Sequence, residues 1–177
     1  MATLSLRMQH QKHSEWCWAA VASSISEHFS RNSPWCQCSL AREMTKRKKH
    51  CCGHPFIKNL AEECNQPWYL DRALRIVKRL GGKVKEGRLS YPQIKKQINE
   101  GRPVCVRIQW GREGAGHFVV ISGCQTSSSG DRWLYIEDPF YGNSTWEFRE
   151  FCTNYQYADG HWTHTFPVKY EVKHVAH

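Results

Sequence analysis

The feature that most constrains the fold is a change of hydrophobic period close to Gly101. Before this glycine, apolar residues recur at helical spacing, whereas after it they form short β-branched and aromatic runs between Gly and Ser clusters. Helices are predicted over 17–29, 38–48 and 67–80, and the capping box Ser90-Tyr-Pro-Gln93 opens a fourth that runs to Gly101. Strands are predicted over 103–110, 117–123, 132–138, 145–148 and 162–172. Helices followed by strands indicate an α+β fold, in which a helical half packs against an antiparallel sheet.

The length of the chain fits one domain. At roughly 100–200 residues per domain, 177 residues leave little room for a second module, and we find no linker or internal repeat. We therefore expect a single domain over 1–177, with 1–100 mainly helical and 101–177 mainly β. The apolar runs are only a few residues long, which argues against a membrane span.

The nine cysteines are an odd number, far above ordinary usage. Such a set can be a disulfide framework, a zinc site, or one reactive thiol added to an even structural set. One group of five lies in an irregular segment and comprises Cys36, Cys38, Cys51, Cys52 and Cys64. It lacks the paired C-x₂-C spacing of strong structural zinc sites, so disulfides are favoured and zinc stays an alternative. Cys105 and Cys124 lie in apolar strands and are expected in the core, while Cys36 and Cys152 remain open.

Cys17 is the candidate for the reactive thiol. It stands at the predicted start of a helix, where the backbone amides stabilise a thiolate. Its own N–H is placed to donate to a developing oxyanion, and Gln11, six residues upstream, could supply a second donor. The alternative is a small buried cysteine between two tryptophans, without chemistry.

A base and its partner are expected at the ends of two neighbouring strands. His117 begins an apolar strand after a glycine-rich loop, and Asp138 ends the next strand before Pro139. If these strands form a hairpin around the turn Ser127-Ser-Ser-Gly130, His117 and Asp138 lie at the same end. Asp138 can then hold the second nitrogen of the imidazole and stabilise the imidazolium. The alternative is an ordinary hydrogen-bonded histidine at a strand terminus.

Taken together, these residues resemble the papain-like cysteine peptidases. Within them the chain is most similar to small bacterial members, namely avirulence-effector peptidases and the leader-peptide peptidase domains of bacteriocin transporters. The resemblance spans about residues 9–148. The matching residues are Gln11, Cys17-Trp-Ala-Ala20, Cys38, Cys51-Cys52, Cys64-Asn-Gln-Pro67, Gly101-Arg-Pro-Val104, Gly116-His-Phe-Val-Val120 and Asp138-Pro139. Trp16-Cys17-Trp18 departs from the Asp-Cys-Gly usual in the transporter peptidases, which makes leader processing the weaker relative.

The resemblance implies a papain-like fold and a Cys17–His117–Asp138 triad with Gln11 in the oxyanion site. It also implies two disulfides among Cys38, Cys51, Cys52 and Cys64, no cofactor, no metal ion, and a preference for glycine next to the cut bond. A related acyl transfer on the same triad (deamidation, transglutamination or deubiquitination) and a non-enzymatic stapled binding module are the alternatives.

The charge of +9 and the N-terminal sequence bear on partners and location. The basic run Lys46-Arg-Lys-Lys-His50 is more typical of a solvated helix face than of a nucleic-acid site. We expect a protein substrate, no membrane partner, and an acidic cognate inhibitor or immunity protein over the cleft. The first residues lack the apolar stretch of a signal peptide. For a bacterial effector or toxin, this predicts secretion by a specialised system and action in the target cell. His161 and His164 are expected at the surface, or one of them in the active-site cleft.

Overall fold

The computed structural model describes residues 2–46, 51–52, 63–111 and 116–170, and its centre is one antiparallel sheet. The order β2-β7-β3-β4-β5-β6 is completed by β1, which pairs with β4. The strands are β1 Ala2–Thr3, β2 Lys85–Glu86, β3 Val104–Trp110, β4 Gly116–Thr126, β5 Arg132–Asp138, β6 Gly142–Glu147 and β7 Gly160–Phe166. The helices are α1 Cys17–Phe29, α2 Gln37–Thr45, α4 Leu70–Ile76, α5 Tyr91–Asn99 and α6 Phe148–Thr153.

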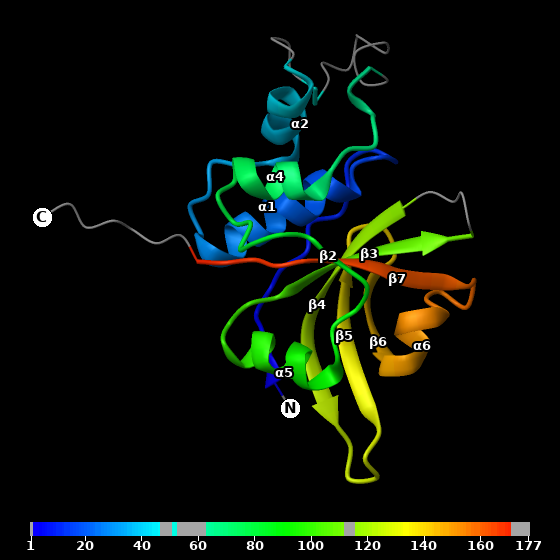
Figure 1. The fold of residues 1–177 in the computed structure, drawn as a ribbon. Helices are drawn as coiled ribbons and strands as arrows, with labels where there is room; N and C mark the ends of the chain where they lie inside the picture. Colours follow the sequence, from blue (N-terminus) through cyan, green and yellow to red (C-terminus); the bar gives the residue numbers. More distant parts are fainter. Residues whose placement is uncertain (1, 47–50, 53–62, 112–115, 171–177) are drawn as a thin grey trace, which may run out of the picture.

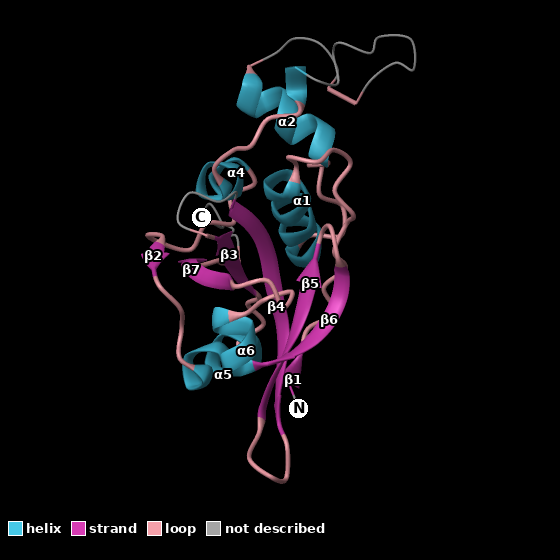
Figure 2. Cartoon of the chain, turned by 90° about the vertical axis from the view of Figure 1, so that its right-hand side faces the viewer, coloured by secondary structure: helices cyan, strands magenta, loops and turns pink. Residues whose placement is uncertain are grey.

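The helices form two groups (Figure 1). α1, α2 and α4 gather at one end of the sheet, whereas α5 and α6 lie along its other part. Figure 2 shows the same division from the side, with the long β4–β5 hairpin extending away from α2. The α+β fold with a helical half and an antiparallel sheet is therefore confirmed, and the mixed layout is that of a papain-like peptidase.

Each face of the sheet has its own core, because strand residues alternate between the faces. On β4, Phe118 and Val120 join the core around α1, α2 and α4. Val119 and Ile121 join the second core, with α5 and α6. Both faces are buried, which explains why this strand is apolar almost without interruption.

Helix bounds agree with the sequence where local signals are strong. α1 covers the predicted residues, and α5 begins at the predicted capping box, in which the Ser90 and Gln93 side chains each accept a hydrogen bond from the other residue's backbone N–H. α2 ends before 48, because Lys46 adopts a left-handed conformation with φ 51°. α4 is shorter than the predicted 67–80, since Lys78 has φ 58° and ends the helical path.

Two strand predictions need correction, and two strands were not predicted. The run 145–148 was expected to be β throughout, but Phe148 begins α6. The last strand ends at Phe166 rather than near 172, because Pro167 follows it and lacks the N–H that pairing requires. The short strands β1 and β2 were not predicted, since two residues carry no periodic signal. Residues 47–50 of the basic run and 171–172 of the last predicted strand lie outside the described residues.

Candidate active site

Cys17 is the first residue of α1, as the sequence predicts. The helix follows a tight turn in which the Trp16 N–H donates to the His13 carbonyl, and no side chain caps its start. The first amides of a helix have no intrahelical partner, so the Cys17 N–H can donate to a ligand. Cys17 itself is 7% exposed, which places the thiol at the edge of the helical core.

Two tryptophans flank Cys17 and fix the helix start. Both are buried, and their indole nitrogens donate to backbone carbonyls, Trp16 to Cys64 at 2.8 Å and Trp18 to Gln66 at 3.0 Å. A buried indole N–H needs such a partner, so residues 64–66 and the start of α1 hold each other. Trp16 and Trp18, which replace the Asp and Gly usual in the transporter peptidases, thus have a structural role in this protein.

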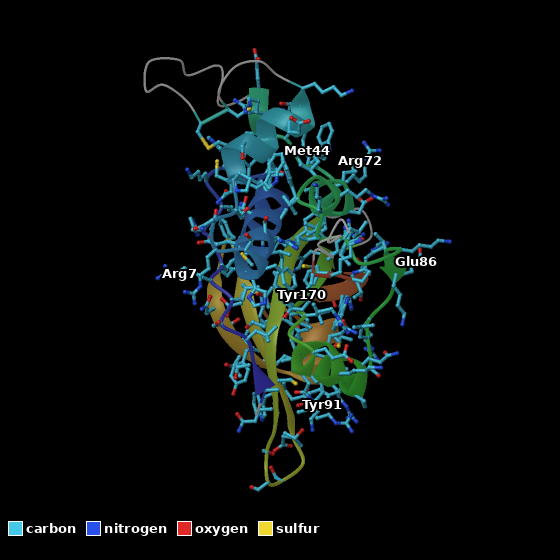
Figure 3. All side chains as sticks on the ribbon, turned by 90° about the vertical axis from the view of Figure 1, so that its left-hand side faces the viewer. Arg7, Met44, Arg72, Glu86, Tyr91 and Tyr170 are labelled. Atoms are coloured by element: carbon cyan, nitrogen blue, oxygen red, sulfur yellow. A yellow bond between two sulfur atoms is a disulfide. The ribbon has the colours of Figure 1, made fainter. Side chains whose placement is uncertain are left out.

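Two disulfides anchor the same region, as the resemblance implies. They join Cys38 to Cys52 and Cys51 to Cys64, with Cα–Cα distances of 5.4 and 5.6 Å. Figure 3 shows the sulfur atoms near α2. Next to Cys64, the Asn65 side chain accepts from the Glu15 N–H and donates to the Ser14 hydroxyl, each at 2.9 Å. The second disulfide therefore fixes a segment that contacts the loop before Cys17.

His117 and Asp138 meet as the hairpin predicts. β4 and β5 pair antiparallel, and His117 Nε2 lies 2.8 Å from Asp138 Oδ1. The Asp138 side chain is fully buried, whereas that of His117 is 12% exposed. With Nε2 on Asp138, Nδ1 is left for a second partner, and Cys17 is close enough to raise the pKa of His117. The three side chains come from α1 and two strands and form one continuous chain of contacts.

The charges of His117 and Asp138 affect one another. Burial lowers the pKa of His117, but hydrogen bonds and charge attraction from Asp138 and Cys17 outweigh it and raise the pKa to about 9. Burial also disfavours the Asp138 carboxylate, yet the hydrogen bond from His117 and the backbone N–H groups of Phe140 and Tyr141 lower its pKa. These contacts favour an imidazolium on His117 beside an ionised Asp138.

Gln11 lies beside the site, but its amide is engaged. Its backbone N–H donates to Pro139, and Nε2 donates to the carbonyls of His13 at 3.0 Å and Ser14 at 2.7 Å. The opposite amide orientation would set Oε1 against two carbonyl oxygens, so the contacts fix the assignment. Both amide hydrogens therefore stabilise the loop before α1, and Oε1 is buried without a partner. Donation from Gln11 to an oxyanion stays a prediction.

Two functional contacts escaped the sequence analysis. The Tyr155 hydroxyl donates to Asp138 Oδ2 at 2.7 Å. Gln37 is buried and clamps the loop before α1, since Oε1 accepts from the Lys12 N–H and Nε2 donates to the His10 carbonyl, each at 2.9 Å. Neither residue lies in a motif, and no signal in the sequence links them to the site.

The other cysteines separate into core and surface. Cys105, Cys124 and Cys152 are buried, which confirms the core assignment of the first two. Cys36 is an exposed free thiol whose sulfur accepts the Ser39 N–H at the start of α2. Disulfides occupy four of the five cysteines for which zinc was the alternative, all except Cys36. Within the described ranges, no group of three or more His, Cys, Asp or Glu residues could hold a metal ion.

The residues next to His117 in the chain line a cavity, and an aromatic surface follows Asp138. The cavity has a volume of about 570 Å³, and Gly116, which precedes His117, is part of its wall. Its other lining residues are mainly apolar and come from α4, the segment before it, and the sheet: Pro67, Trp68, Tyr69, Leu70, Asp71, Val84, Arg107, Phe118, His164 and Phe166. On the Asp138 side, Phe140 and Tyr141 are more than half exposed, and the Tyr141 and His117 ring centroids are 6.2 Å apart.

His161 and His164, both on β7, differ in their surroundings. His161 is exposed and pairs with Asp159, with 2.9 Å between Nε2 and Oδ1. His164 is partly buried and lines the cavity that includes Gly116, and its place in an active-site cleft stays a prediction. Among the helices that the structure describes, none is long and apolar enough to cross a membrane.

Comparison with protein families gives one match. The profile of a family described as "Peptidase_C39 like family" matches residues 3–163. This range includes the start of α1, both disulfides, the His117–Asp138 pair and Tyr155. No curated protein matches the chain.

Proposed function

The chain belongs to the Peptidase_C39 like family, and on this basis we propose that it is a cysteine endopeptidase working through Cys17, His117 and Asp138. Membership supports a cysteine peptidase; the residue roles are our proposal. The observation that carries it is the contact chain in which His117 hydrogen-bonds to Asp138 and its pKa is raised by Cys17 at the start of α1.

In the proposed reaction the Cys17 thiolate attacks a peptide carbonyl, and a tetrahedral oxyanion forms. The Cys17 N–H donates to that oxyanion, and Gln11 can do so if it releases one of its carbonyl contacts. His117 gives its proton to the leaving amine as the C–N bond breaks, which leaves a thioester on Cys17. Water then attacks the thioester, with His117 accepting its proton, and the acid product and the thiolate are released.

The surroundings of His117 support an extended peptide as the substrate. A chain lying across Cys17 can place an apolar side chain in the cavity beside Gly116 and contact the exposed rings of Phe140 and Tyr141 on the other side. Arg107 contributes a charged wall, because its guanidinium lies against Gly116, where an added Cβ would be 2.5 Å from Nε. Glycine next to the cut bond, with the apolar side chain further along the peptide, is the narrower form of the proposal.

The disulfides support the proposed location. Closed Cys38–Cys52 and Cys51–Cys64 bridges fit a protein that meets an oxidising environment, as a secreted effector or toxin does. An acidic inhibitor could cover the cleft of a chain with net charge +9.

Digestion of a proteome-derived peptide library tests the activity. The native protein should generate new termini, with glycine on the acyl side of the cut and an apolar residue nearby, whereas Cys17→Ala should generate none. Cys36→Ser is the matched control, because it removes an exposed free thiol that is not part of the contact chain. Cleavage by Cys17→Ala would overturn the proposal. Mass changes without new termini would instead indicate deamidation or acyl transfer.

A further inference from the structure

We propose that Tyr155 is a positioning residue that locks the Asp138 carboxylate in the orientation in which Oδ1 faces His117. The inference rests on the proposed function, because it assigns a role within the Cys17–His117–Asp138 chain. Its basis is the asymmetric set of donors around Asp138. Oδ1 accepts from His117 Nε2 and from the Phe140 and Tyr141 N–H groups, whereas the Tyr155 hydroxyl is the donor to Oδ2.

Tyr155 is itself held from several directions. It is fully buried, and its N–H donates to the Gly160 carbonyl at 3.0 Å. Its ring packs among aromatic side chains, with centroid distances of 5.1 Å to Trp146, 5.3 Å to Phe151 and 6.4 Å to Trp110. A side chain fixed in this way presents its hydroxyl at one point, as a positioning group must.

The phenol can act only as a donor to Asp138. Burial, followed by the negative charge of Asp138, raises the pKa of Tyr155, so the hydroxyl stays protonated. Asp138 stays ionised, because its pKa is lowered despite its burial. The contact is therefore a charge-assisted hydrogen bond, which is stronger than one between neutral groups.

Without this hydrogen bond, Oδ2 would be buried and unpaired. The terminal torsion of an aspartate is broad, so the carboxylate would turn to share the Phe140 and Tyr141 amides between its oxygens. Such a rotation draws Oδ1 away from His117 Nε2. The imidazolium then loses part of the attraction that favours it, and the charged state of His117 becomes less stable.

The test compares Tyr155→Phe with Tyr91→Phe, both in a Cys36→Ser background that removes the exposed competing thiol. The hydroxyl of Tyr91 lies 3.2 Å from the Thr126 hydroxyl, and Figure 3 shows Tyr91, the first residue of α5, in the part of the molecule away from α2. The readouts are the pH dependence of Cys17 alkylation by iodoacetamide and the titration of the His117 ring by NMR. The titratable groups that face His117 are Cys17 from α1, Asp138 from β5 and Tyr141, whose ring centroid is 6.2 Å away, and all three remain in these variants.

We expect Tyr155→Phe to lower the pH at which His117 loses its proton by about one unit in both readouts. This corresponds to a tenfold loss of proton affinity, the size typical of a hydrogen bond to a charged group. Tyr91→Phe should leave the pH at which His117 loses its proton unchanged. In an Asp138→Asn background, Tyr155→Phe should cause no further shift. If Tyr155→Phe leaves the pH at which His117 loses its proton unchanged, or raises it, the proposal is overturned.

A second variant leaves the hydroxyl in place. In Gly160→Ala, the new Cβ would lie 2.8 Å from the Tyr155 carbonyl oxygen and 2.9 Å from Trp110 Nε1, so Tyr155 must move. We expect the same downward shift, and its absence in a folded Gly160→Ala protein counts against the proposal. Neither readout uses a peptide substrate, so failure here is distinguishable from failure of the proposed hydrolysis.

Discussion

At the scale of the residue, Gln11 has two roles to distinguish: it holds the loop before α1, and it is proposed to donate to the oxyanion. Its Nε2 holds the carbonyls of His13 and Ser14, and these residues form the turn that leads into Cys17. An oxyanion would compete with those carbonyls for the same two hydrogens. Because the oxyanion carries the greater charge, it can take one of them when it forms.

Gln11→Ala should therefore affect turnover more than thiol reactivity. Loss of an oxyanion donor typically lowers kcat by ~10²–10³-fold. Alkylation of Cys17 by iodoacetamide forms no oxyanion, so its rate should stay close to that of the native protein in a Cys36→Ser background. Measuring kcat on a peptide cleaved by the native protein, alongside the alkylation rate, separates the two roles. Equal losses in both would show that Gln11 acts only on the loop.

At the scale of the element, the segment 64–66 links the disulfides to the site. The carbonyls of Cys64 and Gln66 accept the indole hydrogens of Trp16 and Trp18, which flank Cys17. The Cys51–Cys64 bridge ends in this segment, whereas the Cys38–Cys52 bridge ties α2 to the residue after Cys51. The two bridges should therefore differ in their effect on Cys17.

We expect paired substitutions of the two bridges to separate stability from reactivity. The bridges span 14 and 13 residues, so either loss should lower the free energy of unfolding by a similar amount, about 3 kcal/mol. Cys51→Ser/Cys64→Ser should also slow alkylation of Cys17 several-fold, because Trp16 loses a fixed partner. Cys38→Ser/Cys52→Ser is the control. The measurements are denaturant unfolding and the alkylation rate near neutral pH, and equal alkylation rates for both pairs would contradict the link.

The elements also show how much of the fold could be predicted from the sequence. α1, α5 and the β4–β5 hairpin were predicted because their signals are local: small and apolar residues at helical spacing, a capping box, and a Ser/Gly turn. α6 was missed because Thr145–Phe148 continues an aromatic strand pattern, and the helix is capped by Glu147, an uncommon capping residue, which accepts from the Arg149 N–H. Tyr155 could not be predicted at all, since its contact with Asp138 depends on how the chain returns after α6.

At the scale of the whole molecule, the site joins the two cores. Cys17 belongs to the core around α1, whereas Tyr155, which holds Asp138, belongs to the core around α5 and α6. His117 lies between them with its pKa raised to about 9. The protonation of one side chain is therefore coupled to contacts from both halves, and pH should affect the stability of the fold as well as the reactivity of the thiol.

The sign of this effect follows from the raised pKa. With an unfolded value of 6.5 and a folded value of about 9, the imidazolium stabilises the fold below pH 6.5, and the contribution is lost as the pH rises through 9. At about 1.4 kcal/mol per pH unit, this interval corresponds to an upper bound of roughly 3 kcal/mol. The native protein should lose its advantage over His117→Gln in the free energy of unfolding between pH 6.5 and 9.

Cys17→Ala sharpens the test, because it removes one of the two partners that raise the pKa of His117 and leaves the other, Asp138, in place. Its loss of stability on raising the pH should therefore begin near the same pH of 6.5, but it should be smaller and end at a lower pH than in the native protein. Urea unfolding at fixed ionic strength across pH 6–10 provides the measurement for all three proteins. If the difference between the native protein and His117→Gln does not change across this range, the imidazolium does not link the two halves.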